Sequence, residues 1–307
     1  MPTSRTIRLI APSGYCQNQA AAQRAIERLT VNHKLDNAPI ISRRMQRFAG
    51  TDEARLNDLN ELVKLPILPD IILAVRGGYG ASRLLENIDY SGLRARFTDH
   101  ATALCGHSDF TAIQLALLAH SDMVTFSGPM LAGNFGAETL SSFTEGHFWG
   151  VLTQPEYSIT WQDSEDRDGN WQGQLWGGNL AMICSLVGTP WLPKIRDGIL
   201  VIEDINESPF RVERMLLQLH HAGILAQQKA VITGSFTHAT ANDYDAGYQL
   251  STVWEYLEQK TGIPFIHHLD FGHEAETVTL PIGAQATLIA HQKQRQLTLS
   301  GYPYLQP

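Results

Sequence analysis

The sequence predicts an α/β protein with a mostly parallel sheet, and three observations lead to that class. Short apolar runs alternate with amphipathic helical patterns through the first half of the chain. The run 71–75 is apolar throughout, as expected for a strand that helices cover on both faces, and the other runs are mostly apolar. Several runs end in turns rich in glycine, proline or serine, which separate a strand from the next helix.

The elements of the first half follow in order. Each expected strand is a run of five mostly apolar residues, and the expected helix 17–30 has the spacing of an amphipathic helix. The predicted strands are 7–11, 71–75 and 101–105. The predicted helices are 17–30, 53–63, 81–87 and 110–118.

The pattern breaks down at 154–174, where Gln162–Asn170 is polar and aperiodic. We interpret this segment as a linker or a long exposed loop. Residues 1–153 then form an N-terminal parallel-sheet α/β domain, and 175–307 form a smaller C-terminal α/β domain that is richer in β structure. After an apolar run at 180–187, the second domain is expected to contain strands at 198–202 and 230–234, helices at 210–222 and 249–261, and β structure from 277 to 300.

Composition narrows the classes of function. The chain has 307 residues and a net charge of -8, which argues against a nucleic-acid surface. Its three cysteines are scattered and form neither a disulfide framework nor a CxxC site. The N-terminus has no signal-type apolar core and no segment has the length of a membrane span, so a cytoplasmic location is expected.

The most informative segment is Gly106-His107-Ser108-Asp109, between the predicted strand 101–105 and the predicted helix 110–118. A serine at a sharp strand-to-helix turn presents its hydroxyl clear of the sheet, near the positive end of the helix dipole. Ser108 is therefore a candidate nucleophile. The alternative interpretation is a helix N-cap, a common position for serine.

A second candidate feature is the glycine loop at residues 77–80, which follows the predicted strand 71–75. In an open parallel sheet, ligands gather at the carboxyl ends of the strands. The backbone N–H groups of such a loop, with the N–H of Asp109, would suit an oxyanion hole. A phosphate cradle is the alternative, although the loop has neither a P-loop ending nor G-x-G-x-x-G spacing.

A serine nucleophile also needs a base and a carboxylate that orients it. His107 is adjacent to Ser108, and neighbouring side chains on a turn diverge, which disfavours it as the base. His273 lies in a loop after the predicted strands, and Glu203 ends the strand 198–202. Glu203 could equally bind the amides of neighbouring loops.

Two further chemistries remain as alternatives. His267, His268 and His273, with nearby acidic residues, could form a metal site, but no His-Glu-x-x-His motif or i, i+4 histidine pair is present. We therefore predict no metal. Cys105 is disfavoured as a nucleophile because it lies inside an apolar run.

The chain resembles the LD-carboxypeptidase family of serine peptidases, which includes the related microcin C immunity hydrolases. The resemblance rests on an ordered set of segments that covers nearly the whole chain. These are Ala11–Gly14, Phe48–Asp52, Val75–Gly80, Gly106–Asp109, Trp176–Asn179, Ile202–Asp204, Asn206-Glu207, Phe271–His273 and Leu280–Gly283.

The resemblance implies a triad of Ser108 as nucleophile, His273 as general acid/base and Glu203 as the residue that orients the imidazole. It also implies oxyanion donors at the backbone N–H groups of Gly78 and Asp109. The implied activity is removal of the terminal D-alanine from murein tetrapeptides during cytosolic peptidoglycan recycling. Members of the family are metal-free homodimers, so we expect no cofactor and a homodimer.

A carboxypeptidase must also hold the terminal carboxylate of its substrate, and arginine does so well. Arg76 and Gly77 are candidate substrate-binding residues, with Trp176 as a possible pocket wall or a packing residue. Two alternatives remain open. Trp161 and Trp171 would suit a microcin-type hydrolase of aminoacyl-nucleotide analogues, and the glycine loop would suit a non-catalytic module for a phosphorylated ligand.

Overall fold

The first of two sheets is formed almost entirely by the N-terminal half of the chain. The computed structural model describes residues 3–306, and this sheet has the strand order β11-β5-β4-β3-β1-β2. All neighbouring pairs are parallel except β11 with β5. Its strands are β1 (Thr6–Ile10), β2 (Lys34–Asp36), β3 (Ile71–Ala74), β4 (Ala103–Gly106), β5 (Thr125–Ser127) and β11 (Leu280–Ile282).

The second sheet has seven strands in the order β10-β9-β8-β7-β12-β13-β6. The pairs from β10 to β7 are parallel, whereas β7, β12, β13 and β6 pair antiparallel. Its strands are β6 (Glu156–Gln162), β7 (Gly169–Asn179), β8 (Gly198–Ile205), β9 (Gln228–Thr237), β10 (Phe265–Ile266), β12 (Gln285–His291) and β13 (Gln294–Ser300). The predicted α/β class, with more β structure in the second half, is therefore confirmed.

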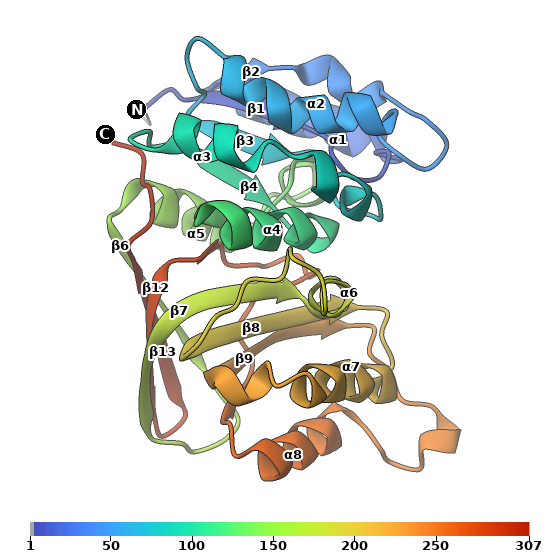
Figure 1. Ribbon diagram of the computed structural model, residues 1–307, viewed down its shortest axis with the longest axis vertical. Coiled ribbons are helices and arrows are strands. Elements are labelled where there is room, and N and C mark those ends of the chain that lie inside the picture. Colours follow the sequence, from blue (N-terminus) through green and yellow to red (C-terminus); the bar gives the residue numbers. More distant parts are fainter. Residues whose placement is uncertain (1–2, 307) are drawn as a thin grey trace.

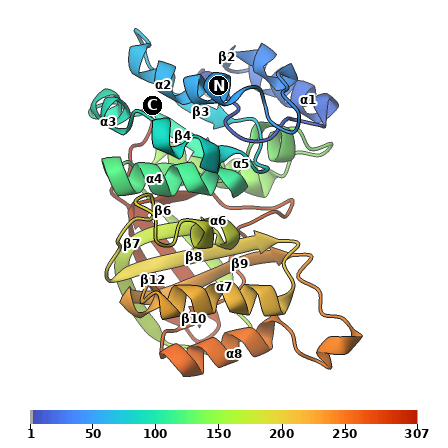
Figure 2. The ribbon, with the colours of Figure 1, turned by 45° about the vertical axis from the view of Figure 1, so that its right-hand side comes forward.

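Helices cover both sheets, and α4 lies between the two halves of the molecule (Figures 1 and 2). In α4 nearly every residue is buried, which explains why its sequence is apolar all round. The helices are α1 (Gln19–Thr30), α2 (Asp52–Asn60), α3 (Tyr90–Phe97), α4 (Thr111–Ser121), α5 (Ser142–Thr153), α6 (Leu180–Ser185), α7 (Pro209–His221) and α8 (Leu250–Thr261).

Helix α7 shows how local sequence sets an element. Ser208 takes the N-cap position and Pro209 the first helical position, where a missing N–H costs nothing. Val212, Met215, Leu216 and Leu219 are buried on one face, as their spacing predicts. Gly223 follows the helix with a φ of +73°, which favours glycine.

The expectation of a linker or exposed loop at 154–174 is wrong for most of that segment. It contains β6 and the first half of β7, and only 163–168 forms a loop. β6 is the edge strand of its sheet, where it buries only Ile159 and Trp161 between exposed polar residues. An edge strand with one polar face carries a weak apolar signal.

One smaller expectation is also corrected. Residues 81–87 form two short 3-10 turns, Ala81–Arg83 and Leu85–Asn87, in place of a helix. Pro281 lies within β11, inside the range 277–300 where β structure is expected. β11 is the edge of the first sheet, where a residue without an N–H is tolerated.

The chain crosses between the two sheets after His273. β10 belongs to the second sheet, whereas β11, inside the range 175–307, pairs with β5 of the first. Near the two ends of the chain, an Arg5 guanidinium nitrogen donates to the carbonyl of Gln306 at 2.6 Å. The division into two domains at 154–174 stays a prediction. Within the described part of the chain, no helix has the length and apolar character needed to cross a lipid bilayer.

Candidate active site

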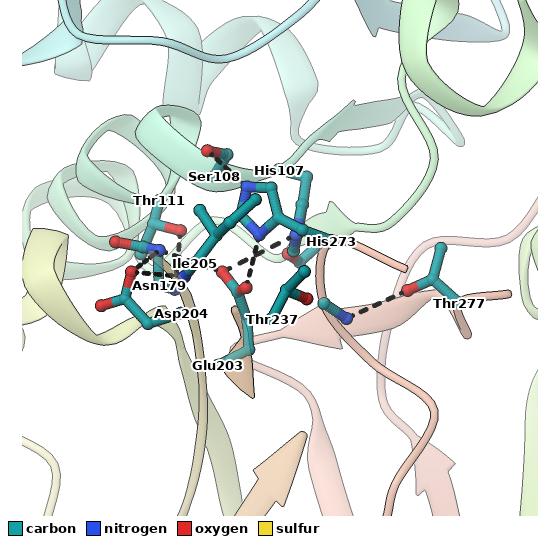
Figure 3. A network of polar contacts seen from close by, with 12 residues as sticks. His107, Ser108, Thr111, Asn179, Glu203, Asp204, Ile205, Thr237, His273 and Thr277 are labelled. Carbon is teal, nitrogen blue, oxygen red and sulfur yellow. Dashed lines mark hydrogen bonds and ion pairs between the residues drawn. The ribbon is translucent and has the colours of Figure 1, made fainter. Parts of the chain in front are cut away.

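Ser108 lies at the carboxyl end of β4, directly before the turn that leads into α4 (Figure 3). Its φ of +62° is in the left-handed region, which costs a residue with a Cβ about 1–2 kcal/mol. Such a strained strand-to-helix turn is typical of a presented nucleophile. A simple N-cap needs no left-handed backbone, since caps take extended angles.

The structure brings Ser108 together with the two residues that the sequence places far from it (Figure 3). His273 Nε2 lies 2.9 Å from Ser108 Oγ, and His273 Nδ1 lies 2.7 Å from Glu203 Oε2. An ionised carboxylate only accepts hydrogen bonds, so Nδ1 carries the proton and Nε2 accepts from the serine hydroxyl. This is the hydrogen-bond order that a serine nucleophile requires.

The surroundings of Glu203 favour its ionised, negatively charged form. Burial of this fully buried carboxyl opposes ionisation, but the neighbouring imidazoles of His107 and His273 and the hydrogen bonds from His273 and Asn179 outweigh it and lower its pKa. Burial opposes protonation of His273 too. There the hydrogen bond and charge of Glu203, with the charges of Asp204 and Glu274, prevail and raise its pKa.

His107 packs beside the triad without joining it. Its ring centre lies 4.9 Å from that of His273, its Nδ1 lies 3.3 Å from Ser127 Oγ, and its Nε2 lies 3.7 Å from Glu203 Oε1. Burial lowers the pKa of His107 to about 4, so this imidazole is neutral at pH 7. Adjacent side chains do diverge here, as the sequence indicates.

Three residues at this site lie close enough together to hold a metal ion. His107, Glu203 and His273 bring one potential ligand atom each within 4.8 Å of one another. This group differs from the cluster of 267–276 that the sequence offered. Its Glu203–His273 contact is the hydrogen bond of the triad, so metal and triad would compete for the same atoms.

Asn179 is a site residue that sequence reasoning missed. Its Nδ2 donates to Glu203 Oε1 at 3.2 Å and to Asp204 Oδ1 at 3.0 Å, and its N–H donates to Thr111 Oγ1 at 3.1 Å. Burial raises the pKa of Asp204 to about 6. Asn179 ends β7 beside Glu203 on β8, a register that sequence spacing does not reveal.

The glycine loop lies against the nucleophile. A Cβ on Gly77 would be 2.8 Å from Ser108 Cβ and 2.9 Å from Ser108 Oγ, so only glycine fits there. The N–H of Gly14 donates to the carbonyls of Gly77 and Gly78, and Asp109 Oδ2 accepts from the N–H of Ala81 at 2.8 Å. In residues 3–306, the N–H groups of Gly78 and Asp109 donate to no other group of the chain.

We expect Gly77→Ala to lower kcat/KM by about 100-fold, because a Cβ at 2.8 Å must push Ser108 or the loop from position. Gly146→Ala is the matched control, since Gly146 is exposed and a Cβ there would meet nothing within 4 Å. Hydrolysis of the substrate by both variants is measured beside wild type. Equal activity of Gly77→Ala and the control would contradict the close fit.

The other residues that the sequence analysis considered lie at various distances from this site. Arg76 lies beside the loop, where its Nη1 donates to the carbonyl of Tyr15 at 2.9 Å. Trp176 is fully buried and its indole donates to Gln228, which fits a packing role. It borders a different pocket, whose lining includes none of Ser108, Glu203 and His273. Trp161 and Trp171 lie in strands β6 and β7 rather than in a loop. Cys105 is buried, which raises its pKa and leaves the thiol unreactive.

Comparison with known proteins identifies the family of this chain. Residues 7–128 match the model of the LD-carboxypeptidase N-terminal domain, and residues 172–288 match that of the LD-carboxypeptidase C-terminal domain. The murein tetrapeptide carboxypeptidase of Pseudomonas aeruginosa is 28% identical, and the match covers 94% of each chain. A probable murein peptide carboxypeptidase of Bacillus subtilis is 30% identical over 80% of this chain and 76% of the relative.

Comparison with solved structures also finds a carboxypeptidase of this family. The crystal structure of muramoyltetrapeptide carboxypeptidase from Oxalobacter formigenes has a TM-score of 0.90 and 41% identity, covering 97% of this chain and 99% of the other. The microcin C7 self immunity protein MccF shares the fold, with a TM-score of 0.87 at 23% identity over 99% of this chain and 98% of the other. The family models together span most of the sequence, and the chain belongs to the LD-carboxypeptidase family.

Proposed function

We propose that the protein is a serine LD-carboxypeptidase that releases the terminal D-alanine of murein tetrapeptides from the preceding L-centre, diaminopimelate or lysine. The observation that carries the proposal is the hydrogen-bonded series Glu203–His273–Ser108. The names of the relatives from Pseudomonas aeruginosa and Oxalobacter formigenes support the substrate class. A cytosolic setting and a homodimer, which the family resemblance implies, stay predictions.

The reaction begins when Ser108 Oγ attacks the carbonyl carbon of the L-centre and transfers its proton to His273 Nε2. Glu203 stabilises the imidazolium that forms. The oxyanion accepts hydrogen bonds from the N–H groups of Gly78 and Asp109, which have no acceptor within residues 3–306.

His273 then donates this proton to the amine of the departing D-alanine, and the C–N bond breaks. The acyl group remains as an ester on Ser108. Water attacks this ester while His273 accepts a proton from it. The ester C–O bond then breaks, His273 returns the proton to Ser108 Oγ, and the tripeptide leaves with a free carboxylate.

The test is mass spectrometry of a tetrapeptide muropeptide after incubation with the protein. We expect the loss of one alanine residue and no internal cleavage. An organophosphonate that modifies serine should label Ser108, and a chelator should leave the release of alanine unchanged. Absence of both release and labelling would overturn the proposal, whereas release that stops with a chelator would favour a metal at His107, Glu203 and His273.

A further inference from the structure

A small pocket opens beside the glycine loop, and three arginines line it. The pocket has a volume of about 170 Å³, and its wall includes Arg44, Arg47, Arg76, Gly78 and Tyr79. The arginines come from two segments that are distant in sequence. Arg44 and Arg47 are exposed residues of the turn before α2, whereas Arg76 follows β3.

The three guanidinium groups lack acidic partners. Among residues 3–306 none of them forms an ion pair, and the pocket wall contains no Asp or Glu. Such a cluster is unexpected in a chain with a net charge of -8. Three unpaired cations around one small cavity repel one another, and an anion bound between them removes that repulsion.

Neutral groups hold these arginines in place. Arg76 donates to the carbonyl of Tyr15, and the guanidinium carbon of Arg44 lies 4.5 Å from the centre of the Tyr15 ring. The guanidinium carbon of Arg47 lies 5.7 Å from the centre of the Tyr79 ring. These contacts use few of the five N–H donors on each guanidinium, so the others remain for a ligand.

The pocket adjoins the reacting centre through Gly78, which supplies a proposed oxyanion donor on one side and pocket wall on the other. A Cβ placed on Gly78 would lie 2.9 Å from Arg76 Nη2. Consecutive Cα atoms of a peptide are 3.8 Å apart, so the carboxylate of the residue after the scissile carbonyl reaches this region. The volume is well below the 300–1,000 Å³ of a pocket for a drug-sized ligand, so it suits a small anionic group such as a carboxylate.

We propose that Arg44 and Arg47, together with Arg76, form the subsite for the α-carboxylate of the leaving D-amino acid. This inference rests on the proposed function and explains why cleavage stops at the last residue. A substrate that continues past that residue has no space in the pocket and presents no negative charge to it. The small volume also selects a small leaving residue such as D-alanine over D-phenylalanine.

The test compares a tetrapeptide that ends in a free carboxylate with the same peptide ending in a carboxamide. For wild type we expect kcat/KM to favour the acid by about 100-fold, since charge-assisted bonds to the carboxylate are lost with the amide. In Arg44→Gln/Arg47→Gln the acid-to-amide ratio should fall about 10-fold, mainly through a higher KM for the acid. Arg76→Lys keeps the charge but loses the planar fork, and it should lower the ratio as well.

Arg94→Gln is the matched control, because Arg94 is an exposed arginine that pairs with Asp122 outside this site. Its acid-to-amide ratio should equal that of wild type. Equal rates for acid and amide in wild type, or an unchanged ratio in the double variant, would overturn the subsite and leave the peptidase intact. Wild type that releases no alanine and takes no label at Ser108 would overturn the proposed function itself.

Two ligand probes complete the design. D-Alanine should inhibit wild type competitively and inhibit the double variant at least about 10-fold more weakly, in line with the same lost bonds. Thermal stabilisation by inorganic phosphate with no inhibition by D-alanine would instead support a phosphate-binding pocket and contradict the subsite.

Discussion

Ser108→Ala is expected to lower the rate of D-alanine release by at least about 1,000-fold while the fold stays intact. The substitution removes Oγ, the atom that forms the covalent bond to the substrate, and the oxyanion hole and binding contacts account for the residual rate. Release is measured by mass spectrometry against wild type. The control is Ser185→Ala, an exposed serine of α6 that we expect to keep wild-type activity. Near wild-type release by Ser108→Ala would eliminate the mechanism.

Two further variants sharpen this experiment. Because Ser108 and His273 act as a unit, the double variant Ser108→Ala/His273→Ala should be about as slow as Ser108→Ala alone. Ser108→Gly should be equally inactive but about 1 kcal/mol more stable to unfolding, since glycine takes a φ of +62° without strain. Thermal melting of the alanine and glycine variants tests the second point, and equal stability would argue against a strained turn.

Glu203→Gln is expected to lower kcat/KM by up to about 10,000-fold and to move the pH profile. The amide can donate to His273 Nδ1, which then holds the wrong tautomer toward Ser108. The profile of kcat/KM falls on the acid side as His273 becomes protonated. Glu203 raises the pKa of His273, so its removal leaves burial to lower that pKa, against the remaining charges of Asp204 and Glu274.

On the acid side, kcat/KM of Glu203→Gln should therefore begin to fall at a lower pH than that of wild type. Its maximal kcat/KM should be much lower. Rates across the pH range for both proteins supply the measurement. Glu61→Gln, which changes an exposed carboxylate paired with Lys64, serves as the control and should reproduce the wild-type profile. A limb that stays in place, or one that moves to higher pH, would show that Glu203 does not act on the base.

The elements that could be predicted from the sequence are those whose burial leaves a local signal. β3 is apolar throughout because helices cover both faces, and α7 carries a proline at its start and a glycine after its end. β5 was not predicted, since its three residues, Thr125–Ser127, include two with hydroxyl groups. β6 was missed because an edge strand with a polar outer face resembles a loop.

Some residues of the candidate site could likewise be predicted from the sequence, and others could not. The turn at Ser108 and the loop at Gly77 could be located because glycines and a serine at strand ends have local meaning. The pairing of Ser108 with His273 and Glu203 came from the family resemblance, since no periodicity reports a contact between residues 165 positions apart. The contacts of Asn179 and of the arginine pair Arg44 and Arg47 depend on how strands and loops pack, so their roles could not be predicted from local sequence.

The crossing of the chain after His273 has a consequence for synthesis under the proposed mechanism. A ribosome makes the N-terminal half first, so the nascent chain displays Ser108 long before its base exists. Pairing of β11 with β5 anchors the segment that follows His273, and this pairing must wait for residues 280–282. Under the proposed mechanism we expect a chain that stops before His273 to be inactive, and separately expressed halves to gain activity only when they reassemble.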